Sequence, residues 1–274
     1  MELMSGAEGR VGGEGTVEEA RRSPSPHVNV GRISYLNVEP FFHAFPWPLG
    51  AALPPRALGE AVADGRIDAG PLALADVIRL EPDLVVLPYG IACPRRAQSV
   101  LLFADRPMRE LGGRRIAVTG ETATSVVLLR ILLALRDEVP APDLVALGEA
   151  AEAELLIGDA ALRALAGRWP RPLCFDLGDE WTRWTGFPMV FAAWAVRREV
   201  PALDRAALAI ALGDALATGL RELPAIARRR ADVRAWGLDE AAVIAYLRAF
   251  EYRLGPTEEK AMAEFRRLLA LLEA

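Results

Sequence analysis

Short apolar runs alternate with amphipathic stretches from residue 28 to about residue 197, and this alternation restricts the chain to an α/β fold. Runs such as DLVVLP (83–88), RRIAVTG (114–120) and FPMVFAAWAVR (187–197) have the length and apolar content of buried strands. Between such runs lie stretches with helical periodicity, for example RALGEAVADGRI (56–67). Everything after Pro201 is expected to be helical.

The order of these runs indicates two lobes. A second α/β unit begins near residue 111 inside the first, and long strands around 99–103 and 190–196 are expected to cross between the two units. We therefore expect a discontinuous first lobe (28–98 and 195–274) and an inserted second lobe (99–194). A cleft between lobes is the default place for a small ligand. Residues 1–27 are Gly-, Ser- and Glu-rich with no apolar segment, which predicts a disordered N-terminal tail.

Composition excludes several classes of function. The formal net charge is −5 without a block of like charges, which argues against a nucleic-acid or membrane-binding surface. No run reaches the ~18 apolar residues of a membrane span, so we expect a soluble, cytoplasmic protein. Lys260 is the one lysine and lies beside two glutamates, which disfavours Schiff-base chemistry. The two histidines and two cysteines form no metal-ligand motif, so no metal is expected.

Three segments carry motifs with a recognisable order and spacing. In GRISYLNVEPF (31–41) a strand ends in a Tyr-Leu-Asn turn and a Pro follows. LLIGDAAL (155–162) and FDLGDEWTRWTGFPMVFAAWAVR (175–197) follow later in the chain. The first segment is similar to the opening of the chorismate dehydratases of the futalosine route to menaquinone, and the other two resemble the second signature of that family. The resemblance covers residue 29 to the end. It implies the two-lobed fold of type 2 periplasmic-binding proteins, with two crossover strands and a ligand cleft.

Four polar residues are the main candidates for the site. Asn37 lies between a strand and a helix, where the residues alone favour an N-cap, whereas the resemblance implies a catalytic residue in the cleft. Ser99 opens a crossover strand, and the resemblance implies that it faces the substrate and is catalytic. Thr124 and Ser125 begin an apolar helix, where they would either cap it or help bind an anion.

A second group is expected to contact the substrate without taking part in the chemistry. Asp159 has an alternative interpretation as a turn-former or a contact at the hinge. Ser34 and Tyr35 are neighbours on the opening strand, so only one of the two would face the ligand. The members of this group are Ser34, Tyr35, Gly70, Pro71 and Asp159.

The resemblance implies a carbon–oxygen lyase that converts chorismate to 3-[(1-carboxyvinyl)oxy]benzoate and water without a cofactor, as a monomer or homodimer. Two alternatives remain at this point. One is a non-catalytic sensor or binding protein that uses the same cleft for a carboxylate. The other is the sister enzyme, 1,4-dihydroxy-6-naphthoate synthase, which opens with a Ser-Pro-Cys-Pro-Asn-Asp type of motif and uses a histidine, whereas this chain opens with SYLNVEPF.

Overall fold

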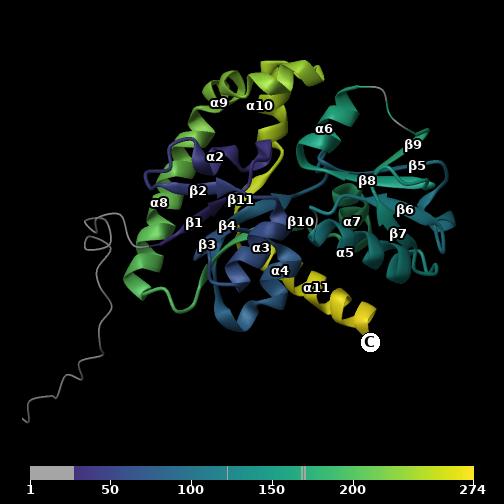
Figure 1. The fold of residues 1–274 in the computed structure, drawn as a ribbon, viewed down its shortest axis with the longest axis horizontal. Coiled ribbons are helices and arrows are strands. Elements are labelled where there is room, and N and C mark those ends of the chain that lie inside the picture. Colours follow the sequence, from purple (N-terminus) through teal and green to yellow (C-terminus); the bar gives the residue numbers. More distant parts are fainter. Residues whose placement is uncertain (1–27, 122, 168, 170) are drawn as a thin grey trace, which may run out of the picture.

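The structure, a computed structural model, describes residues 28–121, 123–167, 169 and 171–274. The expected tail over residues 1–27 lies outside this range. The described chain forms two sheets flanked by helices (Figure 1). We call the six-stranded sheet with its helices the first lobe and the five-stranded sheet with its helices the second lobe. The α/β prediction is confirmed.

The sheet of the first lobe has the strand order β11-β4-β10-β3-β1-β2. β10 pairs antiparallel with both β3 and β4, whereas β1 pairs parallel with β2 and β3. Sequence neighbours β3 and β4 are thus separated by a strand from much later in the chain. The strands are β1 (Val30–Arg32), β2 (Leu49–Ala52), β3 (Ala69–Ala73), β4 (Leu84–Cys93), β10 (Met189–Arg197) and β11 (Glu251–Arg253).

The sheet of the second lobe has the order β7-β6-β8-β5-β9. β5 is antiparallel to both β8 and β9, and β6 is parallel to β7 and β8. Because β10 pairs with first-lobe strands along its length, we propose that the chain returns to the first lobe near residue 188. The strands are β5 (Val100–Ala104), β6 (Arg115–Val118), β7 (Asp143–Ala146), β8 (Ala153–Ile157) and β9 (Leu173–Asp176).

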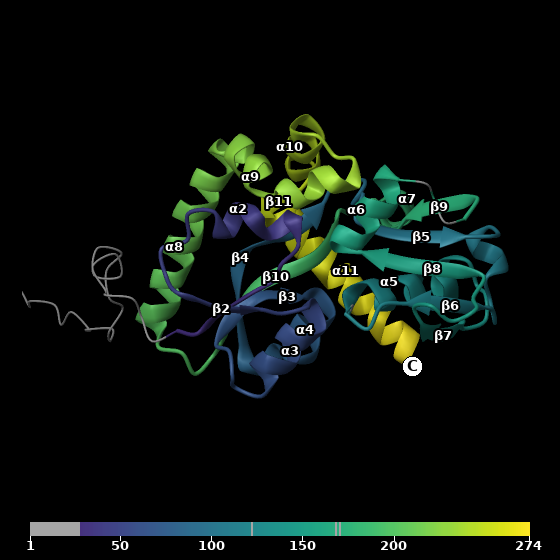
Figure 2. The same cartoon turned by 45° about the horizontal axis from the view of Figure 1, so that its top comes forward.

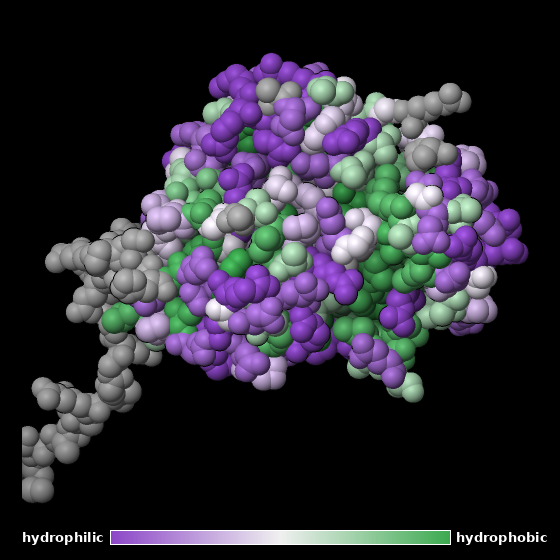
Figure 3. Space-filling view, viewed as in Figure 1, coloured by the Kyte–Doolittle hydropathy of each residue, from purple (hydrophilic) through white to green (hydrophobic). Residues whose placement is uncertain are grey.

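Helices cover both sheets, and each turns an apolar face inward. The surface over α9 and α10, at the top of Figure 3, is mostly hydrophilic. Helices of the first lobe are α2 (Glu39–Phe42), α3 (Pro55–Ala63), α4 (Leu74–Arg79), α8 (Ala202–Arg221), α9 (Leu223–Arg229), α10 (Glu240–Arg248) and α11 (Pro256–Glu273). Helices of the second lobe are α5 (Thr124–Ile131), continued by the π-turn η4 (Leu132–Arg136), α6 (Gly158–Ala166) and α7 (Leu177–Thr185). The short 3-10 turns are η1 (Leu36–Val38), η2 (Glu81–Asp83), η3 (Met108–Glu110) and η5 (Ala231–Trp236).

Three local predictions are wrong. The stretch LCFDLGDEWTRWTG (173–186) predicts an extended segment that runs into a loop, but residues Leu177–Thr185 form α7, whose first N–H groups are capped by the Asp176 carboxylate. The segment IDAGPLAL (67–74) predicts a strand followed by a turn, but the strand leads directly into α4. The chain after Pro201 is not wholly helical, because residues 251–253 pair with β4 as β11. Each of these elements is short, and tertiary contacts decide its conformation.

One hydrophobic core runs through both lobes. Its last contribution comes from α11, which packs against β10 in the first lobe and against α5 and η4 in the second. There Phe265 of α11 meets Trp181 of α7, with the ring centroids 5.7 Å apart. Figure 2 shows α11 running from the first lobe toward the second. The two lobes are therefore held together by a shared helix as well as by the crossing segments.

Candidate active site

A pocket with a cavity volume of about 70 Å³ lies between the lobes and opens to solvent. Its walls come from the β1–α2 connection, the ends of β3 and β4, the start of β5, the N-terminus of α5, the β8–α6 junction and β10. The described lining residues are Ile33, Tyr35, Asn37, Val38, Pro55, Ala73, Ile91, Ser99, Val100, Ala123, Thr124, Ser125, Ile157, Gly158, Phe191, Ala192 and Phe250.

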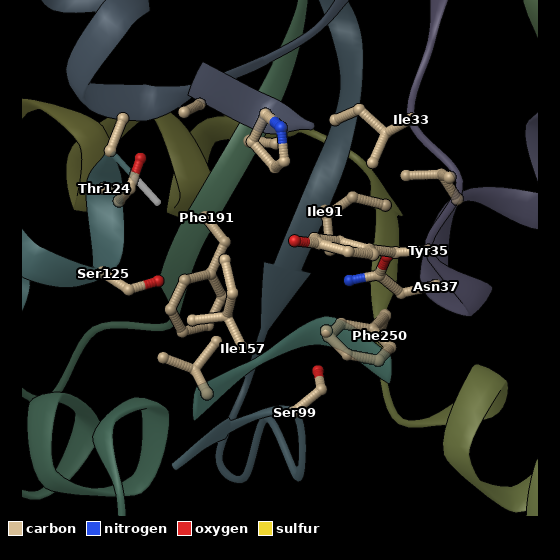
Figure 4. A pocket seen from close by; sticks show the side chains of 17 residues that line it. Ile33, Tyr35, Asn37, Ile91, Ser99, Thr124, Ser125, Ile157, Phe191 and Phe250 are labelled. Atoms are coloured by element: carbon tan, nitrogen blue, oxygen red, sulfur yellow. The ribbon is translucent and has the colours of Figure 1, made fainter. Parts of the chain in front are cut away.

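Five of these lining residues have polar side chains, and all five are residues that the sequence singled out: Tyr35, Asn37, Ser99, Thr124 and Ser125. They come from three distant parts of the chain and from both lobes. Figure 4 shows Tyr35 and Asn37 on one side of the pocket and Thr124 and Ser125 on the other, with Phe191 between them. The other described lining residues are apolar or glycine. The five polar side chains are therefore the groups that can hydrogen-bond a ligand and fix its orientation in the pocket.

Asn37 is not an N-cap. It lies inside η1, and neither η1 nor the following α2 has a side chain that caps its first N–H groups. The Asn37 Oδ1 atom is buried and has no hydrogen-bond partner among the described residues. A buried amide oxygen without a donor costs about 1–3 kcal/mol. The geometry thus removes the structural interpretation of Asn37 and leaves an acceptor at the wall of the pocket.

Ser99 is held at the base of the pocket by its backbone neighbours. The Asp176 carboxylate accepts hydrogen bonds from the backbone N–H groups of Ala97 (3.0 Å) and Gln98 (2.7 Å). Gln98 has a φ of 57°, a left-handed conformation that is uncommon for a non-glycine residue. The Ser99 carbonyl accepts the N–H of Gly158 at 2.8 Å. These contacts fix the turn that brings Ser99 to the start of β5.

The structure assigns different contacts to Thr124 and Ser125. The Thr124 hydroxyl accepts the backbone N–H of Ala75 at 3.2 Å, so it bonds to the first lobe. Ser125 is 5% exposed, lines the pocket and points its hydroxyl into it (Figure 4). The residue before α5, Ala123, provides no side-chain cap for the first turn. Backbone N–H groups at the start of α5 therefore lie at the pocket wall together with the Ser125 hydroxyl.

Tyr35 closes one side of the pocket. Its hydroxyl donates to Glu121 Oε2 at 2.6 Å, and the Glu121 carbonyl accepts the N–H of Arg56 at 3.1 Å. Burial, followed by the hydrogen bond to Glu121, raises the pKa of Tyr35 above its usual value. The Tyr35 ring lies against Gly158, where an added Cβ would be 2.8 Å from the ring.

Four of the predicted substrate contacts do not line the pocket. Gly70 and Pro71 are buried inside β3, opposite Ala195 and Trp194 of β10. The Ser34 side chain is exposed. Pairing within the sheet buries Gly70 and Pro71, and Ser34 lies beyond the end of β1 with its side chain exposed, so none of the three is at the pocket wall.

Asp159 belongs to the contact between lobes. Its Oδ1 accepts the backbone N–H of Leu36 at 3.0 Å, and its Oδ2 pairs with Arg230 at 2.7 Å. Arg230 also bonds to Asp232, and the Arg230 hydrogen bonds lower the pKa of that carboxyl. The geometry therefore favours the hinge contact that the sequence left open as the alternative for Asp159.

Sequence reasoning missed the residues that hold Ser99. In the sequence, Asp176 is one of several carboxylates around the second signature, which are mostly structural; in the structure it caps α7 and binds the Ala97–Gln98 backbone. Tyr246, 147 residues away in sequence, donates its hydroxyl to Ser99 Oγ at 2.8 Å. No local signal marks Tyr246, because its role depends on a long-range contact. The aromatic wall residues Phe191 and Phe250 were likewise assigned no role.

Within the part of the chain that the structure describes, no helix is long and apolar enough to cross a membrane. The same residues contain no cluster of three or more His, Cys, Asp or Glu side chains arranged to hold a metal ion.

Comparisons with solved structures define the class of fold. A structural-genomics protein from Archaeoglobus fulgidus matches with a TM-score of 0.72 and 16% identity, covering 89% of this chain and 97% of its own. The periplasmic aliphatic sulphonate binding protein SsuA from Escherichia coli matches with a TM-score of 0.60 and 18% identity, covering 92% and 87%. A Candida albicans protein described as having the generic periplasmic binding protein fold gives 0.55 and 12%, covering 91% and 92%. The chain has the two-lobed periplasmic-binding-protein fold.

Sequence comparisons identify the family. A family model described as menaquinone biosynthesis matches residues 28–271. A chorismate dehydratase from Thermus thermophilus is 31% identical over 267 residues, which cover 90% of this chain and 96% of that protein. The chain belongs to the menaquinone biosynthesis family.

Proposed function

We propose that this protein is a chorismate dehydratase, a carbon–oxygen lyase that forms 3-[(1-carboxyvinyl)oxy]benzoate and water from chorismate in menaquinone biosynthesis. The Thermus thermophilus relative has this activity in its name, and the matched family is biosynthetic. The observation that carries the proposal is the pocket itself, in which the Asn37 amide and four side chains with hydroxyl groups line one otherwise apolar cavity. We place the enzyme in the cytoplasm, in keeping with a biosynthetic role.

The N-terminus of α5 would bind one of the two substrate carboxylates. Chorismate is a dianion, and the polar side chains among the described lining residues are all neutral. Anions bind at helix N-termini because free N–H groups and the helix dipole favour negative charge there. The Ser125 hydroxyl lies at this position and supplies a further donor. Thr124, whose hydroxyl already accepts the Ala75 N–H, would instead help to hold the closed arrangement.

The reaction removes a ring proton and the hydroxyl group on the neighbouring ring carbon. The C–H bond beside the ether oxygen breaks, and its electron pair delocalises through the diene toward the ring carboxylate. The C–O bond of the hydroxyl then breaks, and the leaving hydroxide takes up a proton to become water, so the ring becomes aromatic. The step is redox-neutral, and we propose that it needs no cofactor.

The substrate's own enolpyruvyl carboxylate would take the ring proton and pass it to the departing hydroxide. Tyr35 is the one titratable group among the described lining residues, and burial raises its pKa. A tyrosine with a raised pKa remains protonated and is a poor base at neutral pH. The protein would therefore contribute orientation and charge stabilisation rather than a basic side chain.

Asn37 and Ser99 would orient the substrate for this transfer. The Asn37 amide lies at the wall with its nitrogen toward the cavity and would hydrogen-bond the ring hydroxyl of the substrate. Ser99, at the base of the pocket, would donate to the hydroxyl as it leaves. Walls formed by Ile91, Phe191 and Phe250 would keep bulk water from the reacting ring.

The test is to incubate the purified protein with chorismate and follow the product by mass and ultraviolet absorbance. The proposal expects loss of one water in the wild type and at least a ~100-fold loss of turnover in Asn37→Ala. Asn29→Ala is the matched control, because Asn29 is exposed and bonds to the Arg66 carbonyl away from the pocket. Saturable chorismate binding without product would instead identify a ligand-binding protein, and full turnover in Asn37→Ala would refute the role of Asn37.

A further inference from the structure

Tyr246 lies behind the pocket and contacts Ser99 from the other lobe. It belongs to α10, is 3% exposed and is not among the described residues that line the cavity. Its hydroxyl donates to Ser99 Oγ at 2.8 Å in a fully buried hydrogen bond. The bond joins the first lobe to the turn that starts the second. The hydroxyl of Tyr246 therefore acts on the pocket through Ser99, whereas its ring contacts the lining residue Phe250.

The hydrogen bond determines which way the Ser99 hydroxyl can point its proton. A serine hydroxyl has one hydrogen to donate and two lone pairs that accept. Tyr246 occupies one lone pair, so the serine hydrogen must be directed elsewhere. In the structure it is within reach of the Ala97 carbonyl, at a long 3.2 Å. An oxygen atom of a ligand in the pocket would compete readily for the same hydrogen.

We propose that Tyr246 is a positioning residue that holds Ser99 in place as a hydrogen-bond donor toward the leaving hydroxyl of the substrate. This inference rests on the proposed function of Ser99. It assigns no direct contact with the substrate to Tyr246. The phenol donates to one lone pair of Ser99 Oγ and thereby holds the side chain in one rotamer. The serine's own hydrogen remains available to donate to the substrate.

The surroundings of Tyr246 keep its phenol a donor. Burial raises the pKa of Tyr246 well above that of a free phenol, so the group stays protonated across the working pH range. Its ring packs edge-to-face on Phe250, with centroids 5.1 Å apart and planes at 85°. Phe250 itself lines the pocket. The ring is thus fixed on one side by the pocket wall and at its tip by Ser99.

The decisive variant is Tyr246→Phe, which removes the hydroxyl and keeps the ring contact with Phe250. We expect kcat to fall about 10-fold with little change in KM, because one buried hydrogen bond to a reacting group is lost. Tyr252→Phe is the matched control. Tyr252 is also fully buried in the same lobe, but its hydroxyl donates to the Leu247 carbonyl at 3.1 Å and does not contact Ser99. That variant should keep the wild-type kcat.

A double-mutant cycle separates positioning from a general structural effect. In the Ser99→Ala background, Tyr246→Phe should have no further effect on kcat, because the group that it positions is absent. An unchanged kcat in Tyr246→Phe alone would overturn the inference. A fall in kcat of the same size when Tyr246→Phe is added to Ser99→Ala would also overturn it, and so would an equal fall in kcat in Tyr252→Phe alone. Either result would show that the effect does not pass through Ser99.

The wild-type assay distinguishes failure of the inference from failure of the proposed function. If the wild type dehydrates chorismate and Tyr246→Phe does so equally well, only the role of Tyr246 is refuted. If the wild type forms no product, the proposed function is refuted, and the role of Tyr246 in that reaction falls with it. Melting temperatures of all variants, measured in parallel, show which of them are folded.

Discussion

The Tyr35 hydroxyl and the Glu121 carboxylate meet at 2.6 Å, and this hydrogen bond joins two loops from different lobes beside the pocket. Tyr35 precedes η1 in the first lobe, whereas Glu121 lies between β6 and α5 in the second. The Arg56 N–H bonds to the Glu121 carbonyl at the same place. The structure is therefore closed on this side, and a ligand that enters here must part the two groups.

Removing this bond should weaken closure. Tyr35→Phe is expected to raise KM for chorismate about 5-fold with a smaller change in kcat, because one charge-assisted hydrogen bond is lost at an exposed position. Glu121→Gln keeps an acceptor oxygen and should have a milder effect. Steady-state kinetics of both variants test this. A KM that stays at the wild-type value in Tyr35→Phe would show that the bond has no part in closure.

Gly158 should be intolerant of any side chain. Its φ is +56°, and an added Cβ would lie 2.8 Å from the Tyr35 ring. Gly158→Ala therefore adds a clash to the ~1–2 kcal/mol cost of a left-handed alanine, and it should also reduce turnover by displacing Tyr35. Gly113→Ala is the control, because Gly113 has a φ of +65° with open space around it. If urea titrations gave equal losses of unfolding free energy for the two variants, the proposed clash would be wrong.

Asp176 should stabilise the crossing segment far more than an ordinary helix cap. Its carboxylate accepts N–H groups from Ala97, Gln98, Gly178 and Asp179, and Asp176→Ala would leave all four without this acceptor. We expect a loss of about 2–4 kcal/mol of unfolding free energy together with lower activity, since Ser99 follows this segment.

Asp239→Ala provides the comparison for Asp176→Ala. Asp239 caps α10 by accepting one exposed hydrogen bond, from the Ala242 N–H. Its replacement by Ala should lower the free energy of unfolding by about 1 kcal/mol. Chemical denaturation of both variants measures the difference. Similar losses for the two would mean that the bonds to Ala97 and Gln98 add little.

The two cysteines should react slowly at neutral pH. Burial raises the pKa of Cys93 to about 12 and that of Cys174 to about 11, so both thiols stay protonated and weakly nucleophilic at pH 8. We expect labelling by Ellman's reagent to be slow in the folded protein and complete in denaturant. Cys174, which is half-buried, should react first as pH rises toward its pKa. Rapid labelling of Cys174→Ser at pH 8 would contradict the burial of Cys93.

The strands and the polar residues of the pocket could be predicted largely because their signals are local. Strands such as β5, β6 and β10 are short apolar runs that need no knowledge of partners. Asn37 and Ser125 were found through motifs at the ends of elements, and the structure brings both to one cavity. Their chemical roles remain proposals.

The rest depended on contacts that no local pattern contains. β11 is three residues long and exists because β4 offers it an edge. Gly70 and Pro71 were expected at the ligand, but pairing with β10 buries them in the sheet. Asp159 bonds to Arg230, which is 71 residues away in the sequence. Ser99 bonds to Tyr246, which is 147 residues away. Such partnerships are set by topology, which a single sequence does not display.

The insertion of β10 between β3 and β4 has a consequence for synthesis on the ribosome. When β3 and β4 emerge they are neighbours in the chain but lack the strand that must lie between them, and about a hundred further residues have to be translated first. The five strands of the second sheet emerge within that interval and can pair among themselves. The strands of the inserted sheet can thus pair while the earlier sheet still exposes open strand edges, and such edges are where a nascent chain is prone to pair with other chains.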